Sequence, residues 1–189
     1  ASVRTGTDDP DFFSFIAGGR GMASKGPKKA DGFDLTQSPS HLLRRCVQYA
    51  NDLFSHEPGA SDLTKQQYTV LSAVEQNEGM SQTDLVAITG IDRSTLAEMI
   101  RRMIEKGLLD RERTEADARA NAVHIAANGR KALRSARSAS DRVERALLSG
   151  LSAADRARFV KMLSAVVSQA ETAEGDAQGA SRRKTRRAR

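Results

Sequence analysis

The segment from Ser81 to Lys106, SQTDLVAITGIDRSTLAEMIRRMIEK, decides the fold. Ser81 and Asp84 have the spacing of a capping box, in which each side chain binds a free backbone amide in the first turn of a helix. Gly90 allows the left-handed backbone of a tight turn, and Asp92 has the side chain of a helix N-cap. Two short helices joined by a glycine turn, the second with a polar N-terminal face, predict a helix-turn-helix.

The apolar residues of this segment fall on one face of each helix. The expected buried residues are, in the first helix, Leu85, Val86 and Ile88 and, in the second helix, Leu96, Met99, Ile100, Met103 and Ile104. Because that face is buried, the opposite face of the second helix must point outward. The outward face carries Arg93, Ser94, Ala97, Glu98 and Arg101.

The hydrophobic period changes after Gly107. Residues 108–113 and 121–125 each have the weak alternation of a short strand, and a polar tip over 114–120 separates them. A two-stranded hairpin directly after the second helix would be a wing, so the sequence predicts a winged helix-turn-helix.

Further helical patterns lie on both sides of this core. An apolar stripe predicts a helix over 40–54, a capping box at Thr64 and Gln67 begins another, and two more are expected over 128–149 and 152–170. The stripe of the 128–149 helix is rich in small residues, which let helix axes approach closely: Ala132, Ala136, Ala139, Val143, Ala146 and Leu147. The outer helices have more apolar surface than one compact domain needs, which predicts a dimer interface.

We therefore expect a mostly α-helical fold with a small β-hairpin wing and a helical dimerisation domain. An irregular N-terminal arm, broken by several glycines, covers 1–37, and a dimerisation helix covers 38–60. The winged helix-turn-helix follows over 61–127, then dimerisation helices over 128–172 and a basic disordered tail over 173–189.

The position of the charge in this 189-residue chain matters more than its net value of +6. Six of the 30 basic residues lie within the last nine positions, 181–189, which hold no acid, so the remainder is balanced at 24 basic and 24 acidic residues. The basic isoelectric point therefore cannot by itself indicate nucleic-acid binding. No apolar run approaches the roughly 20 residues that a membrane span needs, so we expect a cytoplasmic protein without a membrane partner.

Five short motifs, in order along the chain, resemble the MarR (multiple antibiotic resistance regulator) family of transcriptional regulators. Leu63-Thr64 with Gln67-Tyr68 and Leu71 is similar to the family's second helix, SQTDL at 81–85 to its third, and GIDRSTL at 90–96 to the start of its recognition helix. GLL at 107–109 with Arg111, Asp117 and Arg119 resembles its wing, although Ala118 and Ile125-Ala126 depart from the family pattern. Each motif alone is weak, but the ordered set, over about residues 38–170, is specific.

The resemblance implies a homodimer that binds a pseudo-palindromic operator in double-stranded DNA, often as a repressor that a small molecule releases. HLLRR at 41–45 and DRSTLAEM at 92–99 are most similar to regulators of aromatic-acid breakdown, such as nicotinate, hydroxybenzoate or phenylpropenoid pathways. The implied effector is a small aromatic acid or its CoA thioester. No cofactor and no enzymatic activity are expected, because no phosphate-binding loop, acid pair or Ser/His/Asp arrangement stands out.

The outward face of the 93–106 helix suits a DNA contact. Arg93 can bind the O6 and N7 atoms of guanine, and Ser94 and Thr95 can contact phosphate at the helix start, although Thr95 has an equal role as a cap. A carboxylate there is repelled by phosphate, so Glu98 either accepts from cytosine N4 or, as we favour, pairs with Arg101 or Arg102.

The wing offers further candidates in Arg111, Asp117 and Arg119. An arginine at a hairpin tip can enter the narrow minor groove, which favours Arg119, and the resemblance implies that Asp117 braces the loop. The alternative is a solvated rim of charges. Residues 93–119 contain seven basic and six acidic residues, so specific binding must depend on geometry more than on net charge.

The resemblance places an effector between the dimerisation helices and the DNA-reading helices. His41 and Arg45 are four residues apart on one helix face and can bind a carboxylate, and Tyr68 can stack on a ring. Arg44 replaces Arg45 if the helix phase differs by one residue. Alternatively, both arginines are surface charges and Tyr68 belongs to the core.

Other functions remain open at this point. Cys46 lies in an apolar stripe and is expected to be buried and inert, but a redox-sensing repressor that uses Cys46 is an alternative. The three histidines, His41, His56 and His124, lack the spacing of metal ligands. A non-specific architectural DNA-binding protein driven by the basic tail is a second class, and a winged helix that contacts only proteins is a third.

Overall fold

The computed structural model describes residues 34–60, 63–113 and 121–187, in two units, 1–41 and 42–189. In the first unit, the described part holds a single 3₁₀ turn, η1 (Leu35–Gln37), whose N-cap Asp34 accepts a hydrogen bond from the Thr36 amide at 3.0 Å. The first residues of helix α2 (Pro39–His56) follow. The rest of the predicted irregular arm and the wing tip lie outside the described residues.

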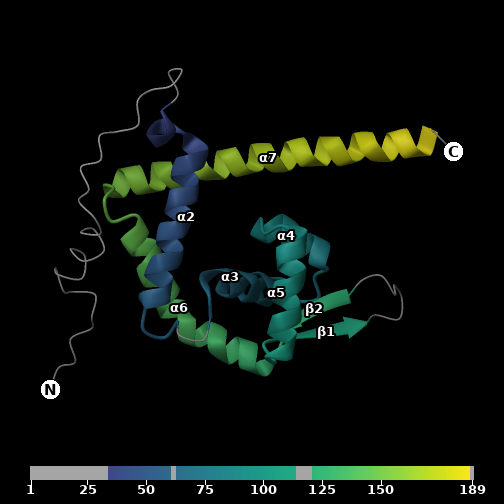
Figure 1. Cartoon of the computed structure of the whole chain (residues 1–189), viewed down its shortest axis with the longest axis horizontal. Helices are drawn as coiled ribbons and strands as arrows, with labels where there is room; N and C mark the ends of the chain where they lie inside the picture. The colour runs from purple at the N-terminus through teal and green to yellow at the C-terminus, as the bar shows by residue number, and fades with distance from the viewer. Residues whose placement is uncertain (1–33, 61–62, 114–120, 188–189) are drawn as a thin grey trace. The chain divides into compact units, whose positions relative to one another are not determined.

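The second unit continues α2 and contains the predicted helix-turn-helix and hairpin (Figure 1). Its other elements are α3 (Lys65–Gln76), α4 (Gln82–Thr89), α5 (Arg93–Glu105), β1 (Leu109–Arg113), β2 (Asn121–Ile125), α6 (Ala127–Leu147) and α7 (Ala153–Arg187). This order confirms the predicted class, mostly α with a β-hairpin after the second helix of the motif.

Local capping explains where the central helices begin. The Thr64 hydroxyl accepts from the Gln67 amide at 3.1 Å, and the Gln67 side chain accepts from the Thr64 amide at 3.0 Å. Ser81 and Asp84 form the same reciprocal pair at the start of α4. Gly90 has φ 65°, a left-handed conformation that ends α4 and turns the chain toward α5. All three signals predicted from the sequence are therefore confirmed.

The core of the second unit is built around α3, which packs on α4, α6 and β2, while α5 packs on α4 and β1. The largest side chains with almost no exposed surface are Phe54, Leu71, Leu85, Leu96, Ile100, Met103, Leu109, Ile125 and Leu133. Burial of each such side chain contributes about 1.5–3 kcal/mol. These contacts hold the two helices of the motif and the base of the hairpin on one scaffold.

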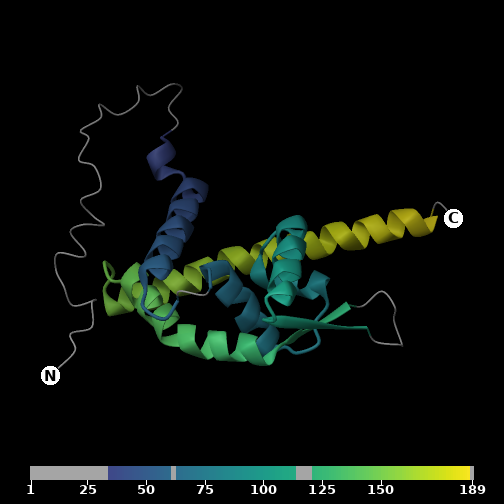
Figure 2. The same cartoon turned by 60° about the horizontal axis from the view of Figure 1, so that its bottom comes forward.

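The hairpin is a two-stranded antiparallel sheet in which Leu109 pairs with Ile125 and Arg111 with Val123 (Figure 2). A short bridge on the other side of β2 joins Val123 to Met80 in the α3–α4 connection. Strand β2 is therefore held on one side by β1 and on the other side by Met80, both at the buried residue Val123.

Burial in α4 and α6 differs in part from expectation. Ile88 is 54% exposed, because only Leu85 of the short helix α4 lies fully inside the core. The small-residue stripe of α6, predicted at the dimer interface, instead includes residues buried within the chain (Ala136, Ala139 and Val143), and α6 packs on α3. Small residues serve there to bring two helices of the same chain close together.

The two outer helices leave apolar side chains exposed in the single chain. They are Leu42, Leu43 and Val47 on α2 and Val160, Met162, Val166 and Val167 on α7. The prediction that Cys46 is buried is wrong, because Cys46 is exposed like the apolar residues Leu42, Leu43 and Val47 of the same helix. Only the C-terminal end of α2, at Leu53 and Phe54, enters the core.

The C-terminal segment also differs from expectation, since the backbone of α7 is helical to Arg187 where a disordered tail was predicted over 173–189. Residues 173–187 are rich in alanine and arginine, which favour helix, and the two glycines among them do not end it. Among the described residues, no helix combines the length and the apolar content that a membrane span requires.

Candidate nucleic-acid interface

The N-terminus of α5 is held by Asp92, whose carboxylate accepts from the Ser94 hydroxyl at 2.6 Å and from the Thr95 amide at 2.9 Å. The hydrogen bond from Ser94, followed by those from Thr95, keeps the pKa of Asp92 well below its usual range. These hydrogen bonds hold the start of the helix. The Ser94 hydroxyl donates its hydrogen to Asp92, so the hydroxyl oxygen can still accept a hydrogen bond from a ligand. Thr95 contributes to the cap through both its backbone amide and its side chain, which is exposed.

Glu98 lies between two arginines, as the preferred interpretation of the sequence predicted. Its Oε1 is 2.6 Å from Nη2 of Arg101 and 2.7 Å from Nε of Arg102, and Arg101 also pairs with Glu105. The hydrogen bond from Arg101 and, to a smaller extent, the one from Arg102 lower the pKa of Glu98 to about 2. In turn, the hydrogen bond to Glu98 is the main cause of the raised pKa of Arg101. This cluster fixes both guanidinium groups, but its positive and negative charges balance.

Arg93 differs from these arginines because it is exposed and, within the described ranges, forms no ion pair or side-chain hydrogen bond. It is the first residue of α5, and the N-terminal part of a reading helix is the part that reaches base edges in a major groove. Ala97, one turn later, is half-buried and adds no charge to this face. On the outward face of α5, here called the reading face, Arg93 is therefore the cation that has no ion-pair partner among the described residues.

A groove of about 490 Å³ runs beside this face, between the start of α3 and α5. It is lined by Thr64, Gln66, Gln67, Ser94, Thr95, Glu98, Met99 and Arg102. Gln66, Gln67 and Arg102 were not among the candidates from the sequence, although the capping box at Thr64 already marked where α3 begins. The groove brings the polar residues at the start of α3 beside the reading face of α5.

In the wing, Arg111 is exposed on β1. The two other predicted wing contacts, Asp117 and Arg119, lie outside the described residues. At the base of the hairpin, Glu78 is 2.5 Å from Nη1 of Arg130 and 3.3 Å from Nδ1 of His124. No cluster of potential metal ligands occurs in the part of the chain that the structure describes.

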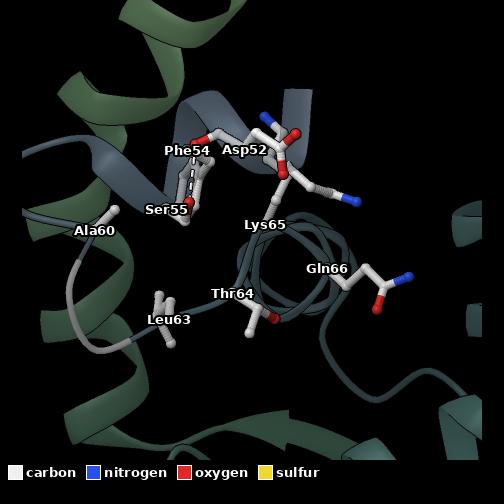
Figure 3. Close-up of a pocket in the computed structure, with 9 residues that line it drawn as sticks. Asp52, Phe54, Ser55, Ala60, Leu63, Thr64, Lys65 and Gln66 are labelled. Atoms are coloured by element: carbon white, nitrogen blue, oxygen red, sulfur yellow. Dashed lines mark hydrogen bonds between the residues drawn. The ribbon is translucent and has the colours of Figure 1, made fainter. Parts of the chain in front are cut away.

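The four residues predicted for an effector are not among those that line the two pockets described beside the start of α3. Arg44 and Arg45 are exposed, His41 is half-buried at the end of the first unit, and Tyr68 is half-buried in the second unit. A pocket of about 460 Å³ lies instead at the end of α2 and the start of α3 (Figure 3). Its lining is Asn51, Asp52, Phe54, Ser55, Ala60, Leu63, Thr64, Lys65 and Gln66.

Lys65 is the cation of this pocket, and the sequence analysis did not single it out. Its Nζ donates to Ser140 at 3.0 Å and to Glu144 at 2.9 Å, and only 17% of its side chain is exposed. The same Nζ lies 5.6 Å from the ring centre of Phe54 and 5.4 Å from that of Tyr68. Tyr68 thus borders the pocket through Lys65 and Phe54, without being one of its lining residues.

These features agree with comparisons to known proteins. Residues 61–120 match the MarR family profile. The transcriptional regulator HosA of Escherichia coli O157:H7 is 37% identical over 123 residues, which cover 65% of this chain and 90% of HosA. The chain belongs to the MarR family. The MarR-family winged helix-turn-helix therefore accounts for the fold.

Two solved structures extend the comparison within the family. The transcriptional regulator PcaV of Streptomyces coelicolor, in complex with its natural ligand, superposes with a TM-score of 0.66 at 30% identity and covers 73% of this chain and 97% of PcaV. Bordetella bronchiseptica BpsR, whose DNA binding is regulated by 6-hydroxynicotinic acid, gives a TM-score of 0.62 at 29% identity and covers 67% of this chain and 96% of BpsR. These relatives are regulators that respond to ligands.

Proposed function

We propose that the chain is a cytoplasmic transcriptional repressor that binds a pseudo-palindromic operator as a homodimer and is released by a small aromatic acid or its CoA thioester. The observation that carries the DNA-binding half is the unpaired, exposed Arg93 at the capped start of α5, next to Ser94 and Thr95. On the same helix Glu98 and Glu105 balance the charges of Arg101 and Arg102. Base reading therefore depends mainly on Arg93, with Arg111 and, at the wing tip, Asp117 and Arg119 as further proposed contacts.

The homodimer is supported by the apolar side chains that the outer helices leave exposed on α2 and α7. Exposed apolar surface of this kind is a typical mark of a protein interface. A second copy of the chain would cover it and give the two reading helices that a two-fold symmetric operator requires.

The first experiment is a titration of upstream DNA by fluorescence anisotropy, with footprinting of the same fragment. Protection of one palindromic site supports a specific regulator, whereas protection of every sequence alike supports the non-specific architectural alternative. The titration is repeated with nicotinate, hydroxybenzoate and phenylpropenoid acids and their CoA thioesters. If specific binding resists every compound, oxidation of the exposed Cys46 becomes the leading switch.

The pocket at Lys65 is our proposed site for the effector carboxylate. The Lys65 ammonium is mostly shielded from solvent, which strengthens a charge-assisted hydrogen bond to an anion. Its counter-ion Glu144 is 58% exposed and can be displaced into water. Phe54 supplies an aromatic wall, and Arg44, Arg45 and His41 remain candidates for the outer end of a longer ligand such as a thioester.

We expect Lys65→Met to abolish the response to the effector while operator binding without effector persists. The methionine keeps the apolar stem and removes the charge that holds the carboxylate. The measurement is the acid concentration that releases half of the operator, together with the acid-induced shift in melting temperature. Lys131→Met, at an exposed lysine on α6, is the matched control and is expected to respond like the wild type. An unchanged response of Lys65→Met would refute this site.

Deletion of residues 181–189 is expected to weaken binding to operator and random DNA alike. The segment carries six basic residues per subunit, and each phosphate contact contributes about 0.9 to the slope of log affinity against log salt. The slope is therefore expected to flatten without loss of the operator preference. A larger loss on operator than on random DNA would contradict the prediction.

A further inference from the structure

Glu78, between α3 and α4, connects three parts of the winged helix-turn-helix. One carboxylate oxygen accepts from Nη1 of Arg130, in the first turn of α6, at 2.5 Å. The other oxygen lies 3.3 Å from Nδ1 of His124 on β2. In sequence these partners are 52 and 46 residues away. A single side chain thus joins the α3–α4 connection both to the last wing strand and to the helix that follows it.

Backbone contacts place this cluster at the base of the wing. The Gly79 amide donates to the Val123 carbonyl at 3.2 Å, and the Val123 amide donates to the Met80 carbonyl at 3.0 Å. Val123 is completely buried. Gly79 has φ +79°, and a Cβ there would lie 3.5 Å from Cε1 of His124, so the imidazole rests against the glycine.

The backbone pair at Val123, together with the buried side chains of Leu109 and Ile125, fixes the inner end of the hairpin. A two-stranded hairpin is at best marginally stable by itself, so its direction depends on what holds its base. Glu78 adds two further points, one on the strand at His124 and one on α6 at Arg130. The hydrogen bond from Arg130 is the main cause that lowers the pKa of Glu78. The carboxylate therefore stays ionised and can hold both partners.

We propose that Glu78 is a positioning residue of the wing, which sets the angle at which the β1–β2 hairpin meets DNA by holding His124 and Arg130 together. This inference rests on the proposed function for its consequence at DNA, where Arg111 on β1 is the wing contact within the described residues. The brace itself is a property of the free protein and can be measured without DNA.

The chain offers a matched control three residues earlier, in α3. Glu75, in the last turn of α3, pairs with Arg137 of α6 at 3.0 Å. This ion pair also joins α3 to α6, but neither residue belongs to the hairpin. Glu75→Gln therefore removes an ion pair of the same kind and leaves the wing anchored, whereas Glu78→Gln removes the anchor.

The first test measures the wing angle in the free full-length protein. Nitroxide labels are attached at Arg111→Cys and Arg134→Cys in a Cys46→Ser background, and labelled chains are diluted with unlabelled chains to remove distances between subunits. We expect the distance distribution to broaden or shift in Glu78→Gln and to match the unsubstituted background in Glu75→Gln. An identical distribution in Glu78→Gln would overturn the brace.

The second test measures operator affinity in a double-mutant cycle with native Arg111. Glu78→Gln is expected to weaken binding roughly 3- to 30-fold, and adding Arg111→Ala should then cost little more, since the two changes remove the same wing contact. Full affinity of Glu78→Gln despite a changed wing angle would overturn the role at DNA. If the wild type binds no DNA, the proposed function fails, while the label distances still decide the brace.

Discussion

Gly129→Ala is expected to destabilise the protein more than alanine at any other described glycine of the chain would by steric overlap. Gly129 is buried in the first turn of α6, and a Cβ there would lie 2.0 Å from the carbonyl oxygen of Leu108 and 3.1 Å from a side-chain carbon of Ile125. That carbonyl cannot move away easily, because it accepts a hydrogen bond from the Ala126 amide at 3.1 Å. The helix start and the wing base must separate to admit the methyl group.

We expect a loss of about 3 kcal/mol or more in the free energy of unfolding, the upper end of the usual cost of overpacking. For a chain of this size, that loss lowers the melting temperature by roughly 6–12 °C. Thermal unfolding at one fixed protein concentration is the measurement, since association makes the melting temperature depend on concentration.

Gly150→Ala is the control for the Gly129 substitution. A Cβ at Gly150 would meet no atom within 4 Å, and its φ is not positive. Alanine there should change the unfolding free energy by less than about 0.5 kcal/mol in either direction. A melting temperature of Gly129→Ala equal to that of Gly150→Ala would mean that α6 does not approach Leu108 as closely as described.

Features that depend on a few neighbouring residues could be predicted from the sequence. The capping boxes at Thr64 and Ser81, the left-handed Gly90 and the N-cap Asp92 each involve residues at most three positions apart. The pairing of Glu98 with Arg101 and Arg102 is also local, because residues three and four apart share a helix face. For this reason the helix-turn-helix and its order of elements agree with expectation.

Features that depend on distant segments could not be predicted in the same way. Period alone places Ile88 and the alanines of α6 on apolar faces, but it does not say which neighbour covers each face. Lys65 and Glu78 have no distinctive local pattern, and their partners at Ser140, Glu144, His124 and Arg130 come close only in the folded chain. The effector pocket and the wing brace therefore required the structure.

Arg93→Ala is expected to produce the largest loss of operator recognition. A bidentate arginine–guanine contact contributes about 1–3 kcal/mol of discrimination, equivalent to roughly 5- to 150-fold in affinity, and a dimer makes it once in each half-site. Affinity for random DNA should change much less, because the remaining phosphate contacts do not depend on sequence. The measurement is the ratio of operator to random-DNA affinity at one fixed salt concentration.

Two further variants separate geometry from charge. Arg93→Lys keeps the positive charge but loses the planar fork that binds guanine O6 and N7, so we expect it to retain random-DNA affinity and lose most of the operator preference. Arg134→Ala removes an exposed arginine on α6 and should leave the ratio unchanged. Equal losses on operator and random DNA in Arg93→Ala would instead identify Arg93 as a phosphate contact. Base reading would then pass to Ser94, Thr95 and the Glu98–Arg102 cluster.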